Sequence, residues 1–245
     1  MSGHSKWSKI KRKKGATDAK RSKVWARLTR DIMVAAREGG GNPNMNPHLV
    51  LAIEKGKAEN LPKDNIERAV KRGTGEIEGA DYEEVNYEGY APHGIAVFVE
   101  SLTDNTNRTV ADLRSLFSKA GGSLSKTGAV AYLFDHKGVI EIPSSGLDEM
   151  ELFDLVVEAG AEDLEQDDDA FMVTTSVEDF DAVRAALHQS GLPVDDARLV
   201  RLPTTTVKLE PSKARKIAEF IEKIEDHQDV QAVYSTLDDS ILETA

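Results

Sequence analysis

The stretch GVIEI, residues 138–142, begins the block of sequence that decides the fold. Its branched apolar residues favour a β-strand, and the amphipathic segment 147–160 after it favours a helix. Two further strand-like segments, AFMVTTS at 170–176 and ARLVRLP at 197–203, lie on either side of a second predicted helix. Residues 161–165 can add a strand that pairs with AFMVTTS. The block then has the order β-α-β-β-α-β, which predicts one ferredoxin-like unit.

The segments on each side of this block both have the order β-α-β. We expect these two flanks to close a second ferredoxin-like unit, with the first unit inserted in it. Two consecutive domains are the alternative interpretation. The expected strands of the flanks are 94–102, 128–134, 205–210 and 230–237, and the expected helices are 107–121 and 211–226.

Three short helices are expected before the first strand, in a helical domain of residues 18–75. The first covers 18–38 and ends at the glycines that follow it. Asn46 is expected to cap the second helix, with Pro47 at its first position. The third begins at Pro62 and stops at Gly73. The GTGEIEG sequence that follows is typical of a linker.

Composition limits the class of protein. A chain of 245 residues with 40% hydrophobic residues can bury a core, and it contains no cysteine. Disulfides, thiol nucleophiles and thiolate metal sites are therefore excluded. The longest apolar runs fall far short of a membrane span, and no secretory signal is expected. We expect a cytoplasmic protein that does not interact with membranes.

Charge is distributed unevenly along the chain. Residues 1–75 contain 18 basic and 7 acidic residues, whereas the whole chain has a net charge of -12. The remaining residues therefore carry an excess of acidic groups. This asymmetry favours a polyanion-binding head on an acidic body, although charge that varies along solvated surfaces is the alternative interpretation.

The basic stretch GHSKWSKIKRKKGATDAKR occupies residues 3–21 and begins with an arm, residues 1–17, that has no apolar periodicity. Its density of cations favours nucleic acid, because each neutralised phosphate releases counterions. Trp7 could stack on an unpaired base or clasp the helical domain, and nothing specifies DNA over RNA. The expected nucleic-acid-binding residues are Lys6, Trp7, Lys9, Lys11, Arg12, Lys13, Lys14, Lys20, Arg21, Lys23 and Arg27.

Two further cations are expected as secondary phosphate contacts. Arg108 follows Thr106 and Asn107, either of which could cap the helix there. A cation near a helix start opposes the dipole, so Arg108 should have a partner, a surface carboxylate or a phosphate. Lys126 lies in the Gly/Ser loop 121–128, which could present backbone N–H groups to phosphate.

No catalytic constellation is evident. The histidines have no partners at metal-ligand spacing, and no nucleophile–base order or isolated carboxylate pair stands out. We therefore expect no enzyme activity, no metal, no cofactor and no small-molecule substrate. An enzyme hidden in the α+β domains is the alternative from another class of function.

The chain also resembles a known family. The stretches GHSKWSKIKRKKGATDAKRSKVWARLTRDI, NPHLVLAIEKGKAENLPKDNIERAVKRGTG and YEGYAPHGIAVFVESLTDNTNRTVADLRSLFSKAGGSLSKTGAVAYLF, with KGVIEI after them, are similar to the YebC/PmpR family. That family includes the mitochondrial translational activator of cytochrome c oxidase subunit I. Two departures are Trp25, where another aromatic is expected, and His48, where arginine is common; the second weakens a phosphate role for the second helix.

The resemblance implies a multidomain α and α+β fold, with an N-terminal three-helix domain followed by two ferredoxin-like α+β domains, one inserted in the other. It also implies a nucleic-acid-binding regulator of gene expression. Family members are described as DNA-binding transcriptional regulators and as ribosome-associated translation factors that relieve stalling at proline-rich stretches. The partner would be DNA, ribosomal RNA or tRNA, and the ribosome. The expected domains are 1–17, 18–75, 82–135 with 205–245, and 136–204.

Overall fold

The structure, a computed structural model, describes residues 18–78, 81–167 and 169–238, with side chains from Arg21 onward. The described chain divides into two compact units. One contains the residues up to Ala129 together with Ala218–Val233, and the other contains Val130–Ile217 together with the residues from Tyr234 onward. No helix within the described ranges is both long and apolar enough to cross a membrane.

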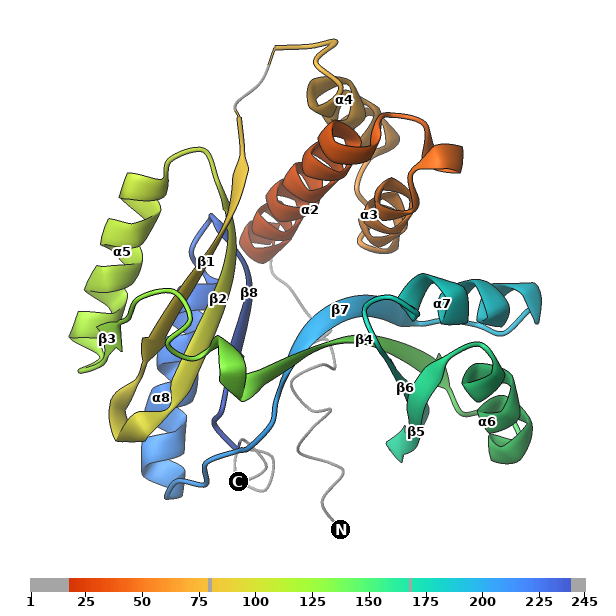
Figure 1. Cartoon of the computed structure of the whole chain (residues 1–245). Coiled ribbons are helices and arrows are strands. Elements are labelled where there is room, and N and C mark those ends of the chain that lie inside the picture. Colours follow the sequence, from red (N-terminus) through yellow and green to blue (C-terminus); the bar gives the residue numbers. More distant parts are fainter. Residues whose placement is uncertain (1–17, 79–80, 168, 239–245) are drawn as a thin grey trace. The chain divides into compact units, whose positions relative to one another are not determined.

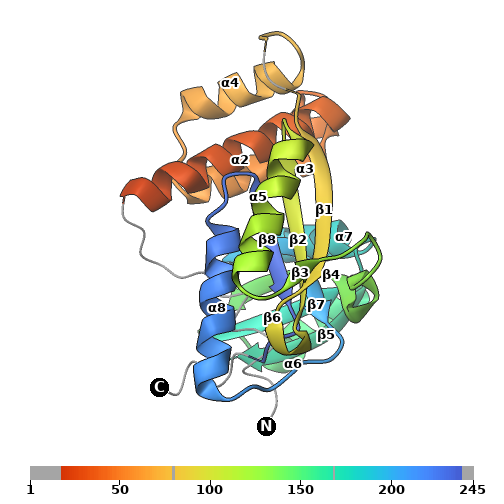
Figure 2. The ribbon, with the colours of Figure 1, turned by 90° about the vertical axis from the view of Figure 1, so that its left-hand side faces the viewer.

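The first unit begins with three helices that pack around a common core (Figures 1 and 2). The long helix α2 contacts both α3 and α4, and its apolar stripe, which includes the fully buried Ile32, faces them. The predicted three-helix domain is confirmed. The helices are α2 (Asp18–Gly39), α3 (Pro47–Ala58) and α4 (Lys63–Gly73), with a 3-10 turn η1 (Pro43–Met45) between the first two.

Asn46 joins the end of α2 to the start of α3, as the sequence predicts. Its Oδ1 accepts a hydrogen bond from the backbone N–H of Leu49 at 3.0 Å, which caps α3. Its Nδ2 donates to the carbonyl oxygens of Ala35 and Gly40, at 2.7 and 2.8 Å. The buried amide therefore satisfies backbone groups of both helices and fixes the turn between them.

Gly73 permits the close approach of α4 to α2. A Cβ at this position would meet the carbonyl oxygen of Met33 and would lie 2.8 Å from the Cβ of Ala36. The two helix backbones are therefore in contact at this point, and any larger residue would separate them.

The first sheet lies in the same unit except for the last residues of β8, and its strand order is β3-β1-β2-β8. Strands β1 and β2 form a long antiparallel pair. Helices α5 and α8 lie on the same side of this sheet (Figure 1), and Phe117 of α5 meets Phe220 of α8 edge to face with ring centroids 5.0 Å apart. The elements are β1 (Glu83–Tyr90), η2 (Pro92–Gly94), β2 (Ala96–Thr103), α5 (Thr106–Lys119), β3 (Ser123–Leu124), α8 (Pro211–Glu225) and β8 (Val230–Ser235).

Three sequence-based expectations for this sheet are wrong. Segment 128–134 is not a strand, because it forms the 3-10 turn η3 (Ala131–Leu133), and the short β3 takes its place. Segment 205–210 is not a strand either, since Val207 makes only one isolated bridge, to Leu237. Strand β1, which was not predicted from the sequence, lies inside the sheet between β3 and β2. The spatial order is that of a ferredoxin-like unit, but this strand precedes the others in the chain.

The second sheet belongs to the second unit and has the strand order β5-β6-β4-β7. Its elements follow one another as β-α-β-β-α-β, which confirms the predicted ferredoxin-like unit. Helices α6 and α7 contact each other and the sheet (Figure 1). The elements are β4 (Phe134–Pro143), α6 (Glu149–Glu158), β5 (Ala161–Asp167), β6 (Ala170–Thr175), α7 (Phe180–Gln189) and β7 (Asp196–Pro203).

The buried core of the second unit explains why its strands could be predicted from the sequence. In β4, Ile140 and Ile142 are fully buried and lie opposite Val173 and Phe171 of β6. Strand β6 is buried along its whole length, which produces the continuous apolar run of its sequence.

Candidate nucleic-acid interface

The arm that carries most of the predicted nucleic-acid contacts falls outside the described residues. The described part of the interface therefore begins with the basic residues of α2. Lys6, Trp7, Lys9, Lys11, Arg12, Lys13, Lys14 and the side chain of Lys20 lie outside the described part, and their role stays a prediction.

Two of the predicted contacts on α2 have partners within the chain. The ammonium of Lys23 lies 3.0 Å from the carboxylate of Asp226, and the guanidinium of Arg27 donates to the carbonyl oxygen of Glu225 at 3.1 Å. Both partners are at the C-terminal end of α8, where a cation complements the helix dipole. Burial lowers the pKa of Arg27, and Asp31 opposes that shift. These two cations therefore stabilise the packing of α2 on α8, whereas Arg21 is exposed.

A basic surface on α4 was not singled out from sequence. Arg68, Lys71 and Arg72 are exposed, and their spacing places them on one face, opposite the buried Ile66 and Ala69. Within the described ranges, none of these three cations makes an ion pair. We call these three residues the α4 basic surface. Its signal in the sequence is ERAVKR, in which the cations recur at helical spacing against an apolar stripe.

Unpaired cations at this spacing suit a phosphate backbone, because phosphate contacts need positive charge without fixed base geometry. Arg68, Lys71 and Arg72 can all contact phosphate, and the two arginines also have the geometry for bidentate contacts to guanine, so these residue types do not distinguish phosphate contacts from base readout.

A cavity of about 580 Å³ lies at the C-terminal ends of α2 and α4, and Arg37 and Arg72 line it. The guanidinium of Arg37 already has partners within the chain, since it forms an ion pair with Asp81 at 3.1 Å and donates a hydrogen bond to the carbonyl oxygen of Tyr82. Glu78 and Asp81 line the same cavity and disfavour an anion within it. The cavity is therefore a poorer candidate for binding an anion than the exposed α4 basic surface, with which it shares Arg72.

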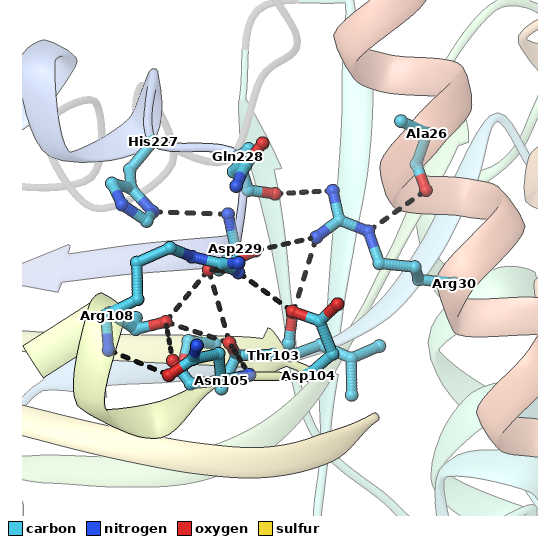
Figure 3. Close-up of polar contacts among 12 residues, drawn as sticks. Ala26, Arg30, Thr103, Asp104, Asn105, Arg108, His227, Gln228 and Asp229 are labelled. Atoms are coloured by element: carbon cyan, nitrogen blue, oxygen red, sulfur yellow. Dashed lines mark hydrogen bonds and ion pairs between the residues drawn. The ribbon is translucent and has the colours of Figure 1, made fainter. Parts of the chain in front are cut away.

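A buried ionic network fastens α2 to the first sheet (Figure 3). At its centre is Asp229, whose side chain is 2% exposed and whose carboxylate lies 3.3 Å from Arg30 and 2.7 Å from Arg108. The hydroxyl groups of Thr103 and Thr109 also donate to this carboxylate, at 3.2 and 2.8 Å. Burial alone would raise the pKa of Asp229, but the hydrogen bonds from Arg108 and Thr109 hold it below its ordinary value.

The two secondary candidates differ in their surroundings. Arg108 forms ion pairs with Asp104, at 2.9 Å, and with Asp229. Two carboxylates therefore serve as the partner that was expected for it. Its helix is capped by Asn105 and not by Thr106 or Asn107, because the Oδ1 of Asn105 accepts the N–H of Arg108. Lys126 is exposed in the turn before Gly128. A phosphate contact for either cation stays a prediction.

The histidines and carboxylates within the described ranges form no group of three or more that could hold a metal ion. His227 lies 3.2 Å from Asp112, and its Nδ1 accepts the backbone N–H of Asp229. This imidazole is therefore part of the support around Asp229.

Two family models match nearly the whole chain. The "TACO1/YebC protein N-terminal domain" matches residues 5–76, and the "TACO1/YebC second and third domain" matches residues 82–237. The chain belongs to the TACO1/YebC family. The resemblance seen in the sequence is thereby confirmed, and the nested fold that the resemblance implies agrees with the strand orders of both sheets.

Relatives in this family include proteins of Chlorobaculum tepidum and Rubrobacter xylanophilus, each named "Probable transcriptional regulatory protein". They are 51% and 54% identical over 97% of this chain, and 95% and 96% of their own lengths are matched. A crystal structure of a conserved hypothetical protein from Aquifex aeolicus, Aq1575, is 43% identical, with a TM-score of 0.84 over 94% of this chain and 96% of that chain.

Proposed function

We propose that this member of the TACO1/YebC family is a nucleic-acid-binding regulator of gene expression, in which the basic arm and the helical domain contact the phosphate backbone. The observation that carries this proposal is the α4 basic surface. Its cations have no carboxylate partners within the described ranges, whereas Lys23, Arg27, Arg30 and Arg108 each have a partner within the chain. The α4 basic surface is therefore a group of cations on one helix face whose charge is available to a phosphate backbone, and the arm of residues 1–17 carries the further cations predicted from the sequence.

The names of the relatives favour a DNA-binding transcriptional regulator. A second candidate is a ribosome-associated translation factor that binds RNA, because the phosphate contacts that the α4 basic surface offers suit RNA as well as DNA. The acidic part of the chain after residue 75 also supports the second candidate, since it would repel a long flanking duplex.

The proposal is tested by reversing charge on the α4 basic surface. In the triple variant Arg68→Glu, Lys71→Glu, Arg72→Glu, we expect affinity for a 25-bp duplex or for a single-stranded RNA of equal length to fall roughly 100-fold. The slope of log affinity against log salt should become shallower by about 2 to 3, because each lost phosphate contact removes nearly one released counterion. Fluorescence anisotropy at two salt concentrations measures both quantities.

A matched control separates local contacts from total charge. The variant Lys213→Glu, Arg215→Glu, Lys216→Glu makes the same charge change at exposed positions of α8. It should weaken binding far less than the α4 variant. Equal losses in both variants would show that net charge alone governs binding and would overturn the assignment to α4.

The two candidates are distinguished by sedimentation of a lysate through a sucrose gradient. A translation factor travels with ribosomal particles, survives DNase, and is released by RNase or higher salt. A transcriptional regulator stays at the top of the gradient and still retards duplex DNA. Reversal of Lys11, Arg12, Lys13 and Lys14 to Glu should abolish binding in either case, and unchanged affinity would remove the arm from the interface.

A further inference from the structure

An exposed apolar stripe runs along α6 in the second unit. Met150, Phe153 and Val157 are 76%, 47% and 44% exposed, and their spacing of three and four residues places them on one side of the helix. The opposite side buries Leu152 and Val156 against the sheet. Single exposed apolar residues are common, whereas these three lie together on one face of a helix and so call for an explanation.

Acidic residues border this stripe on both sides. Glu149 lies on one flank, and Glu151, Asp154 and Glu158 lie on the other, whereas α6 contains no basic residue. Acidic residues in the first turn complement the helix dipole, but Asp154 lies in the middle of α6, where the dipole has little effect, and Glu158 lies in the last turn, where a negative charge is unfavourable. The stability of the helix therefore does not explain these two carboxylates.

The surrounding unit is strongly acidic. Residues 136–204 contain 17 acidic and four basic residues, and three of those cations are already paired: Lys137 with Glu162, Arg184 with Asp181 and Arg198 with Asp196. A field of this sign repels nucleic acid and attracts a positively charged protein segment.

A second copy of the chain that docks through the same stripe does not fit this surface. A two-fold contact would place the same acidic flanks against one another, which disfavours association. We propose that the α6 stripe is the docking site for a basic amphipathic helix of another protein, whose apolar residues cover Met150, Phe153 and Val157 while its lysines and arginines meet the acidic flanks. This is the helix-to-helix form of peptide recognition, with an apolar centre and a charged rim. The proposal is independent of the nucleic-acid interface.

The test uses the full chain and a defined probe, an 18-residue synthetic helix of leucine and lysine with leucine at i, i+3, i+4 and i+7. Its affinity is measured by isothermal titration. We expect the double variant Met150→Ser, Phe153→Ser to bind at least tenfold more weakly. Met45→Ser is the matched control, because Met45 is 80% exposed in the helical domain and should leave the affinity unchanged.

A photo-cross-linker on the leucine face of the probe then locates the contact. Cross-links to α6 support the proposal, and Asp154→Asn with Glu158→Gln should make the affinity less dependent on salt. Equal binding by the double variant, or cross-links confined to other elements, would overturn it.

Two outcomes would assign the stripe to a different occupant and so would also overturn the proposal. The first is self-association in sedimentation experiments that the double variant abolishes, which would indicate a second copy. The second is a shift of the ¹⁹F signal of fluorotryptophan at Trp7 in the double variant, which would indicate the chain's own basic arm.

Discussion

Replacement of Asp229 by Asn tests whether the buried network fastens α2 to the first sheet. The substitution keeps the volume and removes the charge that Arg30 and Arg108 share. A hydrogen bond to a charged group contributes roughly 1.5–3 kcal/mol, and breaking a buried ion pair costs about 3–5 kcal/mol. Arg30 keeps its bonds to the carbonyl oxygens of Ala26 and Gln228, and Arg108 is partly exposed to water. We therefore expect a loss near the lower end, about 3 kcal/mol.

The assay is urea unfolding followed by the fluorescence of Trp25 in a Trp7→Phe background. Trp25 reports on the correct unit, because its indole N–H donates to the carbonyl oxygen of Glu59 in the helical domain. A double-mutant cycle with Arg30→Met isolates the pair from the other contacts of each residue.

The pH dependence gives a second readout of the same network. The pKa of Asp229 is lowered in the folded protein, so its contribution is present above the ordinary pKa of about 3.9 and is lost as pH falls through the lower folded value. The Asn variant should lose this part of the acid sensitivity. A loss of stability below about 1 kcal/mol, with unchanged hydrogen exchange in α2, would refute the anchoring role of Asp229.

Two further substitutions test the helical domain. Burial raises the pKa of Asp31 to about 6, against the opposing effect of Lys55, so its native form binds protons more readily than the unfolded chain between pH 4 and 6. Asp31→Asn should therefore stabilise the protein by about 1–2 kcal/mol at pH 7 and by little at pH 4; equal effects at both pH values in urea unfolding would contradict this. Gly73→Ala should cost about 2 kcal/mol or more, because the added methyl group meets α2, and an unchanged melting temperature by circular dichroism would show that the helices can separate freely.

Local chemistry in the sequence was sufficient for much of the fold. Asn46 and Pro47 marked the start of α3, and the apolar runs of β4 and β6 marked the buried strands of the second sheet. Each of these signals lies within a few residues of the element that it predicts, and tertiary packing agrees with it.

Strand β1 was missed because its sequence, EEVNYEGY, is rich in glutamate. Glu88 is nevertheless 2% exposed, and its carboxylate accepts the N–H of Gly128, a partner 40 residues away. The apolar run at 128–134 was wrongly predicted to be a strand because its residues are apolar. In the structure it contains a 3-10 turn, in which Tyr132 is 71% exposed, and Val130 before it is fully buried.

The partners of the candidate site residues could not be predicted from the sequence either, because they are distant along the chain. A partner for Arg108 was predicted from the sequence, but Asp229 was not recognised as that partner, because it lies 121 residues away. Lys23 and Arg27 were predicted to contact nucleic acid, and in the structure each contacts the end of α8, some 200 residues later. The domain boundaries expected from sequence stay predictions.

The late position of β8 in the chain sets the order in which the protein can fold during synthesis. Thr103 ends β2, and its partner Asp229 leaves the ribosome 126 residues later. At a synthesis rate of roughly 5–20 residues per second, the edge of β2 stays unpaired for about 6–25 s before β8 can pair with it. The β4–β7 unit is contiguous and can form during that interval. The anchorage of α2 through Arg30 is therefore among the last contacts to close, when nearly the whole chain has been made.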